Sequence, residues 1–172
     1  MSVDRLPADF YMQDVLTVAP ALLGKTLVRV LPSGEISRHV ISETEAYRGG
    51  EDLACHASKG KTPRTSVMFE PGGRLYMYLI YGMYWMLNVV TASEDVPQAV
   101  LVRGLRDVSG PGRLTRKLEL DGSFNRENLV SSPRIYLAGK APIPEYTTHP
   151  RIGIDYAGET WKNKPWRFVM KS

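Results

Sequence analysis

The sequence predicts an α+β fold built as one domain over residues 1–172. Two pairs of segments rich in branched and aromatic residues flank turn signals, which is typical of β-hairpins. Apolar side chains at helical spacing occur only in short stretches. Hydrophobic residues make up 43% of the chain and charged residues 23%, and this composition fits a single globular core.

An interrupted helix is expected over residues 9–23, where apolar side chains recur at near-helical spacing. Pro20 would break a continuous helix there, and Gly24 would end it. Residues 26–31 and 36–47 carry many branched side chains and flank a turn signal, so they predict the first hairpin.

The second hairpin is expected from residues 74–80 and 85–91, which flank Tyr81 and its glycine-containing turn. A tyrosine at the tip of a hairpin has no obvious neighbour to pack on. Tyr81 is therefore expected either to fold back onto the sheet or to project as a wedge.

Shorter elements are expected in the rest of the chain. Residues 51–58 predict a helix and residues 98–105 a strand. Glycines and a proline lead into a helix expected over residues 114–121, whose free N-terminal amides suit a phosphate, although an ordinary loop-to-helix junction is the simpler interpretation. Residues 131–150 are rich in proline and include one short strand at 134–138.

The charge balance favours an anionic partner. Lys and Arg total 22 against 18 Asp and Glu, which gives a net charge of +4 and a pI near 9.2. Cys55 is the only cysteine, so no intramolecular disulfide can form, and the three histidines lack the spacing of a zinc site. With no apolar leader and no run long enough to span a bilayer, we expect a protein of the reducing cytoplasm without membrane contact.

Two carboxylates stand close together near the end of the first hairpin. If residues 41–47 are extended, Glu43, Glu45 and Tyr47 share one face of the strand. The carboxylates would then lie roughly 7 Å apart, and a fold that buried this face would have to shift the pKa of at least one of them. The alternative is a solvated strand face with ordinary surface charges.

A series of motifs follows in order along almost the whole chain. It consists of Glu43-Thr44-Glu45-Ala46-Tyr47, Asp52, Ala54, His56, Thr62-Pro63-Arg64, Met68-Phe69, Pro71-Gly72, Leu75-Tyr76, Tyr78, Ile80-Tyr81-Gly82-Met83-Tyr84, Asn88, Leu101-Val102-Arg103, Gly110-Pro111-Gly112 and residues 151–159. In this order the motifs resemble the alkyladenine (3-methyladenine or methylpurine) DNA glycosylase family. So many matched positions are far more specific than any single motif.

The resemblance implies a base-excision repair enzyme that flips a damaged purine out of double-stranded DNA and hydrolyses its N-glycosidic bond. The implied substrates are alkylated or deaminated purines: 3-methyladenine first, with 7-methylguanine, hypoxanthine and ethenoadenine as further candidates. The resemblance also implies a curved, mainly antiparallel sheet with a protruding hairpin that inserts into DNA. Because the reaction needs no lysine nucleophile or metal, we expect a monofunctional enzyme that leaves an abasic site. We also expect no cofactor, a monomer without an obligatory protein partner, and association with the nucleoid through DNA binding.

The resemblance assigns roles around the paired carboxylates. Glu45 corresponds to the general base that activates water for attack on C1′, and Arg103 to the arginine that helps hold the carboxylate and the water. Glu43 has no assigned role, so we expect a structural one, either as a cap or in a pair with a neighbouring base such as Arg48 or Arg103.

Further positions match the family's base pocket. The rings of Tyr47, Tyr78 and His56 would hold the faces of the purine. Asn88 would crowd the 2-amino group of normal guanine. Tyr81 would be the wedge that fills the space left by the flipped base.

Departures from the family pattern lie mainly at the periphery. Lys61 and Thr65 replace a frequent arginine and a frequent asparagine, so phosphate contacts from that loop would be arranged differently. Two other functions are open: a non-catalytic module that binds distorted nucleic acid through stacking tyrosines, and a hydrolase of free nucleosides. Tyr81 argues against the second, because a small substrate needs no wedge.

Overall fold

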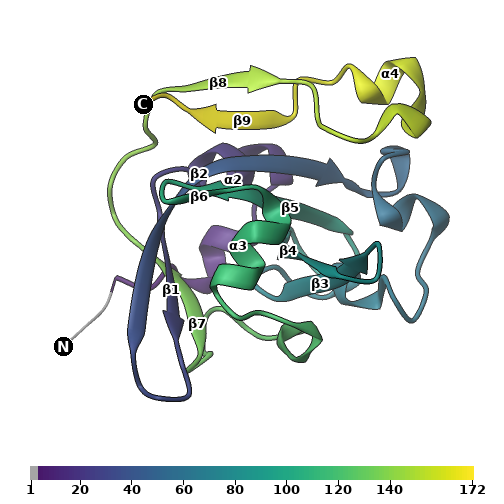
Figure 1. Ribbon diagram of the computed structural model, residues 1–172. Coiled ribbons are helices and arrows are strands. Elements are labelled where there is room, and N and C mark those ends of the chain that lie inside the picture. The colour runs from purple at the N-terminus through teal and green to yellow at the C-terminus, as the bar shows by residue number, and fades with distance from the viewer. Residues whose placement is uncertain (1–3) are drawn as a thin grey trace.

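A curled antiparallel sheet is the framework of the molecule (Figure 1). The computed structural model describes residues 4–172. Its strands are β1 (Thr26–Val30), β2 (Ile36–Arg48), β3 (Leu75–Ile80), β4 (Tyr84–Thr91), β5 (Gln98–Leu105), β6 (Val108–Ser109), β7 (Ile135–Ala138), β8 (Tyr146–His149) and β9 (Arg167–Met170). Neighbouring strands follow the order β3-β4-β5-β2-β1-β7, with β6 on β5, β9 on β2 and β8 on β9.

The helices are short. The α-helices are α1 (Ala8–Tyr11), α2 (Val15–Ala21), α3 (Pro111–Lys117) and α4 (Gly158–Lys162), and the 3₁₀ helices are η1 (Gly49–Glu51), η2 (His56–Lys59), η3 (Ser66–Phe69), η4 (Gly122–Phe124) and η5 (Asp155–Ala157). This content confirms the α+β class and the curved, mainly antiparallel sheet. The two expected hairpins, β1–β2 and β3–β4, and the expected strand β5 are also confirmed.

Strand β2 links the two halves of the sheet. Its first half pairs with β1, and its second half pairs with β5 and β9. The register with β5 shifts between Ile41 and Glu43 and again between Glu43 and Thr44. Such an irregularity bends a strand and increases its twist. The second half of β2 thereby passes below the β8–β9 hairpin in Figure 1.

The main core lies on the side of β2 that α2 covers. Thr44 Oγ1 donates a hydrogen bond to the Ala19 carbonyl of α2 at 2.9 Å, and Ala46 is part of the same core. Because side chains alternate along a strand, Glu45 and Tyr47 face the opposite side. The folding of α2 onto the sheet thus places the Glu45 carboxylate away from the main apolar core.

The first helical segment is interrupted as expected, but not at Pro20. The break falls at residues 12–14, and Asp14 begins α2 as an N-cap whose carboxylate accepts a hydrogen bond from Leu16 N at 2.8 Å. Pro20 lies inside α2, near its end, where the missing N–H removes one bond from a helix with a buried apolar face. Within residues 4–172, no helix has the length and apolar character needed to cross a membrane.

Two other helix predictions are wrong in position. Residues 51–58 form no single helix, because the Asp52 carboxylate accepts a bond from Ala54 N at 3.0 Å and so competes with helical bonding between η1 and η2. Helix α3 begins at Pro111 instead of Leu114, since proline suits the first helical position, and it ends at Lys117.

Candidate active site

An open cavity of about 330 Å³ lies between strands β3, β4 and β5 and the loops that contain residues 54–56 and 152–156. Its lining includes the predicted site residues Tyr47, His56, Tyr78, Tyr81, Asn88 and Arg103. Glu45 lies directly behind the wall, in hydrogen-bond contact with the lining residues Tyr47 and Ile152. The structure therefore brings every predicted site residue to one cavity or to its wall.

Glu45 is completely buried, with 0% of its surface exposed. Tyr47 Oη donates to Glu45 Oε1 at 2.6 Å, and the Ile152 backbone N–H donates to Oε2 at 2.7 Å. Arg103 Nε lies 3.8 Å from Oε2. Burial raises the pKa of Glu45, and Arg103 and the two hydrogen bonds oppose this rise. The site thus holds one carboxylate in a fixed orientation, with a greater affinity for a proton than an ordinary glutamate has.

The second carboxylate, Glu43, lies closer to solvent. Its Oε2 is 3.4 Å from Arg103 Nε and accepts a hydrogen bond from Arg167 Nη1 at 3.0 Å. The Nε edge of Arg103 therefore lies close to both carboxylates of the strand face. The expected pairing of Glu43 with Arg103 is confirmed, and Arg167 of strand β9 is a partner that was not expected.

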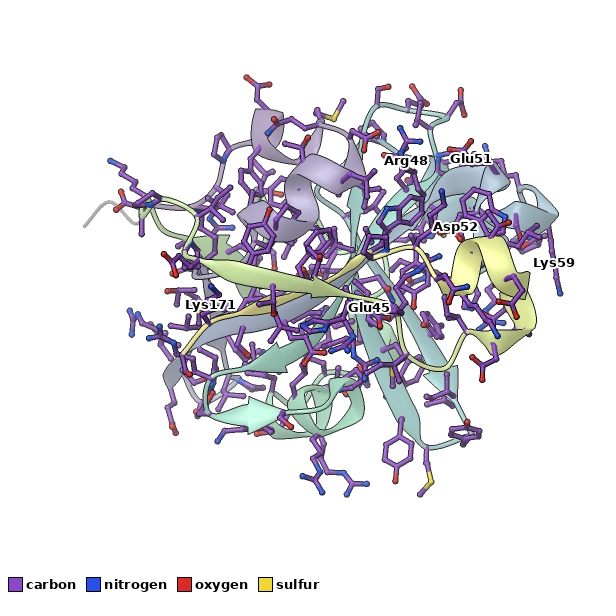
Figure 2. All side chains as sticks on the ribbon, turned by 90° about the horizontal axis from the view of Figure 1, so that it is seen from above. Glu45, Arg48, Glu51, Asp52, Lys59 and Lys171 are labelled. Atoms are coloured by element: carbon purple, nitrogen blue, oxygen red, sulfur yellow. The ribbon has the colours of Figure 1, made fainter. Side chains whose placement is uncertain are left out.

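Arg48, the other expected partner of Glu43, pairs elsewhere. It contacts Asp14 at 2.9 Å and Glu51 at 2.8 Å. Glu43 and Arg48 are five positions apart along β2, so the two side chains leave opposite faces of the strand and this pairing was wrong. Figure 2 shows Arg48 beside Glu51, whereas Glu45 lies nearer the middle of the molecule.

Aromatic side chains form much of the cavity wall. His56 and Tyr78 meet edge to face, with ring centroids 4.5 Å apart and planes inclined at 65°. The hydroxyl of Tyr76 lies 2.9 Å from His56 Nδ1 and fixes the imidazole ring. Tyr47, which also lines the cavity, is held by its bond to Glu45. These rings provide flat surfaces suited to a planar ligand.

The imidazole of His56 is uncharged at neutral pH. Burial lowers the pKa of His56 to about 4, and the nearby cations Arg64 and Lys59 act in the same direction. A neutral ring can lie against a positively charged ligand without repelling it. His56 is therefore compatible with a cationic aromatic ligand.

The side chain of Asn88 is buried, whereas that of Tyr81 is largely exposed to solvent. Asn88 is buried on β4, and its Nδ2 donates to the Tyr76 carbonyl at 3.1 Å, which fixes the amide against the cavity. Tyr81 is 87% exposed at the tip of the β3–β4 hairpin, with a positive φ of 51°. Such a backbone conformation is uncommon for a residue with a side chain. Of the two expectations for Tyr81, projection is the one observed.

Two residues that received no site role from the sequence, Ile152 and Arg151, contact the predicted site residues Glu45 and Tyr47, and a third, Asp52, binds Arg151. Ile152 supplies the backbone N–H that binds Glu45, and its neighbour Arg151 forms a fully buried ion pair with Asp52 at 2.6 Å. Asp52 and residues 151–159 belong to the matched motifs, which was the available signal. The sequence could not indicate that segments about 100 residues apart meet behind Glu45.

The described part of the chain contains no cluster of side chains suited to bind a metal ion. Among residues 4–172, no group of three His, Cys, Asp or Glu side chains is arranged to hold a metal ion. Cys55 is buried, and burial raises the pKa of its thiol to about 11. The thiol is therefore protonated at neutral pH and is a poor nucleophile.

The curled sheet and this cavity define a protein that can hold a planar ring among aromatic side chains beside a buried carboxylate. The chain belongs to the methylpurine-DNA glycosylase family, since the family model described as "Methylpurine-DNA glycosylase (MPG)" matches residues 9–110 and 106–172. The protein is accordingly a DNA glycosylase, a hydrolase of DNA repair that processes alkylated bases. Monofunctional character is consistent with this family.

Near full-length relatives from three organisms carry the name "Putative 3-methyladenine DNA glycosylase". The protein of Myxococcus xanthus is 47% identical over 177 residues, covering 96% of this chain and 90% of the relative. The protein of Methanocella arvoryzae is 42% identical over 187 residues, with coverages of 97% and 92%. That of Legionella pneumophila is 43% identical over 176 residues, with coverages of 97% and 94%.

Proposed function

We propose that the protein releases alkylated purines, 3-methyladenine foremost, from double-stranded DNA by flipping the damaged nucleotide into the cavity and hydrolysing its N-glycosidic bond. The observation that carries this proposal is the Glu45 carboxylate. It is fully buried at the wall of an aromatic cavity and oriented by the Tyr47 hydroxyl and the Ile152 amide. A carboxylate in this position suits a general base.

In the proposed reaction, Glu45 takes a proton from a water molecule as the water oxygen bonds to C1′ of the deoxyribose. The bond between C1′ and the purine nitrogen breaks, and its electron pair leaves with the purine. The negative charge of Glu45 stabilises the positive charge that develops on the sugar. Arg103, within 3.8 Å of Glu45 Oε2, would help hold the carboxylate and the water.

The cavity wall supports a cationic purine as the leaving group. A purine such as 3-methyladenine or 7-methylguanine carries positive charge and departs readily. Tyr47 and Tyr78 would lie against its faces, and His56, neutral because its pKa is about 4, would not repel it. Asn88 would exclude normal guanine by crowding its 2-amino group.

Excision from defined duplexes tests this function. Wild-type protein is expected to release 3-methyladenine and 7-methylguanine from duplexes with one lesion, to leave undamaged guanine in place, and to produce strand breaks only after alkaline treatment. Excision rates on hypoxanthine and ethenoadenine duplexes show whether the protein also releases neutral lesions. Lesion binding without base release would favour the non-catalytic module instead, and release from free nucleosides would favour the nucleoside hydrolase.

The projecting Tyr81 is proposed to fill the gap that the flipped nucleotide leaves. Tyr81→Ala is expected to slow single-turnover excision by about tenfold or more, because about 1.4 kcal/mol of the few kcal/mol needed to unstack a base is no longer offset. Tyr81→Phe keeps the ring and is expected to retain most of the rate. Equal rates for the alanine variant and the wild type would show that Tyr81 is only a turn residue.

A further inference from the structure

Asp52 and Arg151 form an ion pair in which neither side chain has any exposed surface. Arg151 Nη1 donates to Asp52 Oδ2 at 2.6 Å and Nη2 donates to Oδ1 at 2.9 Å, so two parallel bonds fix the guanidinium plane. Asp52 also accepts the backbone N–H groups of Arg48 and Ala54, both at 3.0 Å. The pair therefore ties the end of β2 to the loop that leads to η2.

Stability alone is a weak explanation for this pair. Removing two charges from water costs several kcal/mol for each ion, and replacing a buried pair with apolar residues is often neutral or stabilising. A pair that makes this many directed bonds is better explained by the geometry it imposes.

Arg151 contacts the two residues that follow Glu45 on β2. Its Nη1 donates to the Ala46 carbonyl at 2.9 Å, and its guanidinium carbon lies 4.9 Å from the ring centroid of Tyr47. The residue after it, Ile152, donates the N–H that binds Glu45 Oε2. Both hydrogen bonds to the Glu45 carboxylate thus come from residues that Arg151 contacts or adjoins.

We propose that Asp52 and Arg151 are positioning residues for Glu45: the buried pair fixes the Ile152 amide and the Tyr47 ring, and these two groups fix the carboxylate. The inference rests on the proposed function, in which Glu45 activates water. Neither member of the pair touches the substrate. The ionisable groups that face Glu45 are Tyr47, Tyr78, Tyr156, Arg103, Arg151 and, through Arg103, Glu43.

Two variants test the proposal by different chemistry. Arg151→Lys keeps the buried charge pair, and with it the fold. A lysine cannot make the four directed bonds of the guanidinium, which are two to Asp52 and one each to the Ala46 and Trp161 carbonyls. The double variant Asp52→Asn with Arg151→Gln removes both charges, so that no unpaired charge stays buried. Both are expected to bind a 7-methylguanine duplex as the wild type does and to excise the base about 10²-fold more slowly in single turnover, as a misplacement of about 1 Å would cause.

The pH dependence separates positioning from plain structural support. Arg151 and the Ile152 hydrogen bond both lower the pKa of Glu45 against the effect of burial. The double variant is therefore expected to reach half-maximal excision at a higher pH than the wild type, and Arg151→Lys, which keeps the charge, at a pH between the two. Loss of stability alone would lower the folded fraction without moving this midpoint.

Arg134→Lys is the control for the Arg-to-Lys change itself, because Arg134 makes a two-point pair with Glu127 at 3.0 and 3.1 Å that is partly exposed and lies away from the cavity lining. It is expected to change neither the rate nor the midpoint. Wild-type rates and an unmoved midpoint in folded Arg151→Lys and in the double variant would overturn the proposal. If the positioning proposal fails in this way, an active wild type and an inactive Glu45→Gln in the same assay would still support the proposed function. An inactive wild type would refute the function itself.

Discussion

Replacing Glu45 with glutamine is expected to lower the single-turnover rate of base release by about 10²–10⁴-fold and to leave binding to a lesion-containing duplex unchanged. Glutamine can keep both hydrogen bonds of the site. Its amide oxygen can accept from Ile152 N–H, and its NH₂ group can donate to the Tyr47 hydroxyl, which rotates to accept. The negative charge that takes the proton from water and stabilises the sugar cation is lost.

Glu43→Gln is the matched control for this experiment, since Glu43 has the same chemistry and lies two residues away on the same strand. Its contacts are with Arg103 and Arg167, and it does not line the cavity, so a much smaller loss is expected. Excision rates and binding constants on 3-methyladenine or hypoxanthine duplexes measure both variants. Wild-type excision by Glu45→Gln, or equal losses in the two variants, would contradict the assignment of Glu45.

Local patterns sufficed for the two hairpins. In β1–β2 and β3–β4, each strand pairs with its neighbour in sequence across a short turn, so alternation and turn residues determine the pairing. Strand β8 was not expected, and β9 pairs with β2 although more than 100 residues separate the two strands in the sequence. Such pairing depends on partners that no local window of sequence contains.

The two carboxylates, Glu43 and Glu45, show the same difference between what local sequence determines and what tertiary contacts determine. Alternation along β2 correctly places Glu43 and Glu45 on one face, and local sequence makes them equivalent. The structure makes them different, because the Ile152 N–H binds the fully buried Glu45 while Arg167 of β9 binds Glu43 near the surface. The resemblance to a family pointed to Glu45, and the tertiary contacts supply a physical reason for that choice.

The excision of a cationic lesion is expected to decline as the pH falls, with a half-maximal point above the ordinary glutamate pKa of 4.5. Glu45 must be ionised to accept a proton from water, and burial raises its pKa, so the active form is lost at a higher pH than for an exposed glutamate. Below the midpoint, the rate should drop about tenfold for each pH unit, since the ionised fraction does so.

The pH profile of kcat/KM for a 7-methylguanine duplex measures this titration in the free enzyme. The positive charge on the imidazole ring of 7-methylguanine comes from its methyl group, so acid is not needed to make this base a good leaving group. Because the pKa of His56 is about 4, the imidazole titrates below the expected midpoint. His56→Gln is therefore expected to lower the rate without moving the midpoint. A flat profile down to pH 4.5 would contradict the raised pKa of Glu45, and a midpoint that disappears in His56→Gln would show that the histidine is the titrating group.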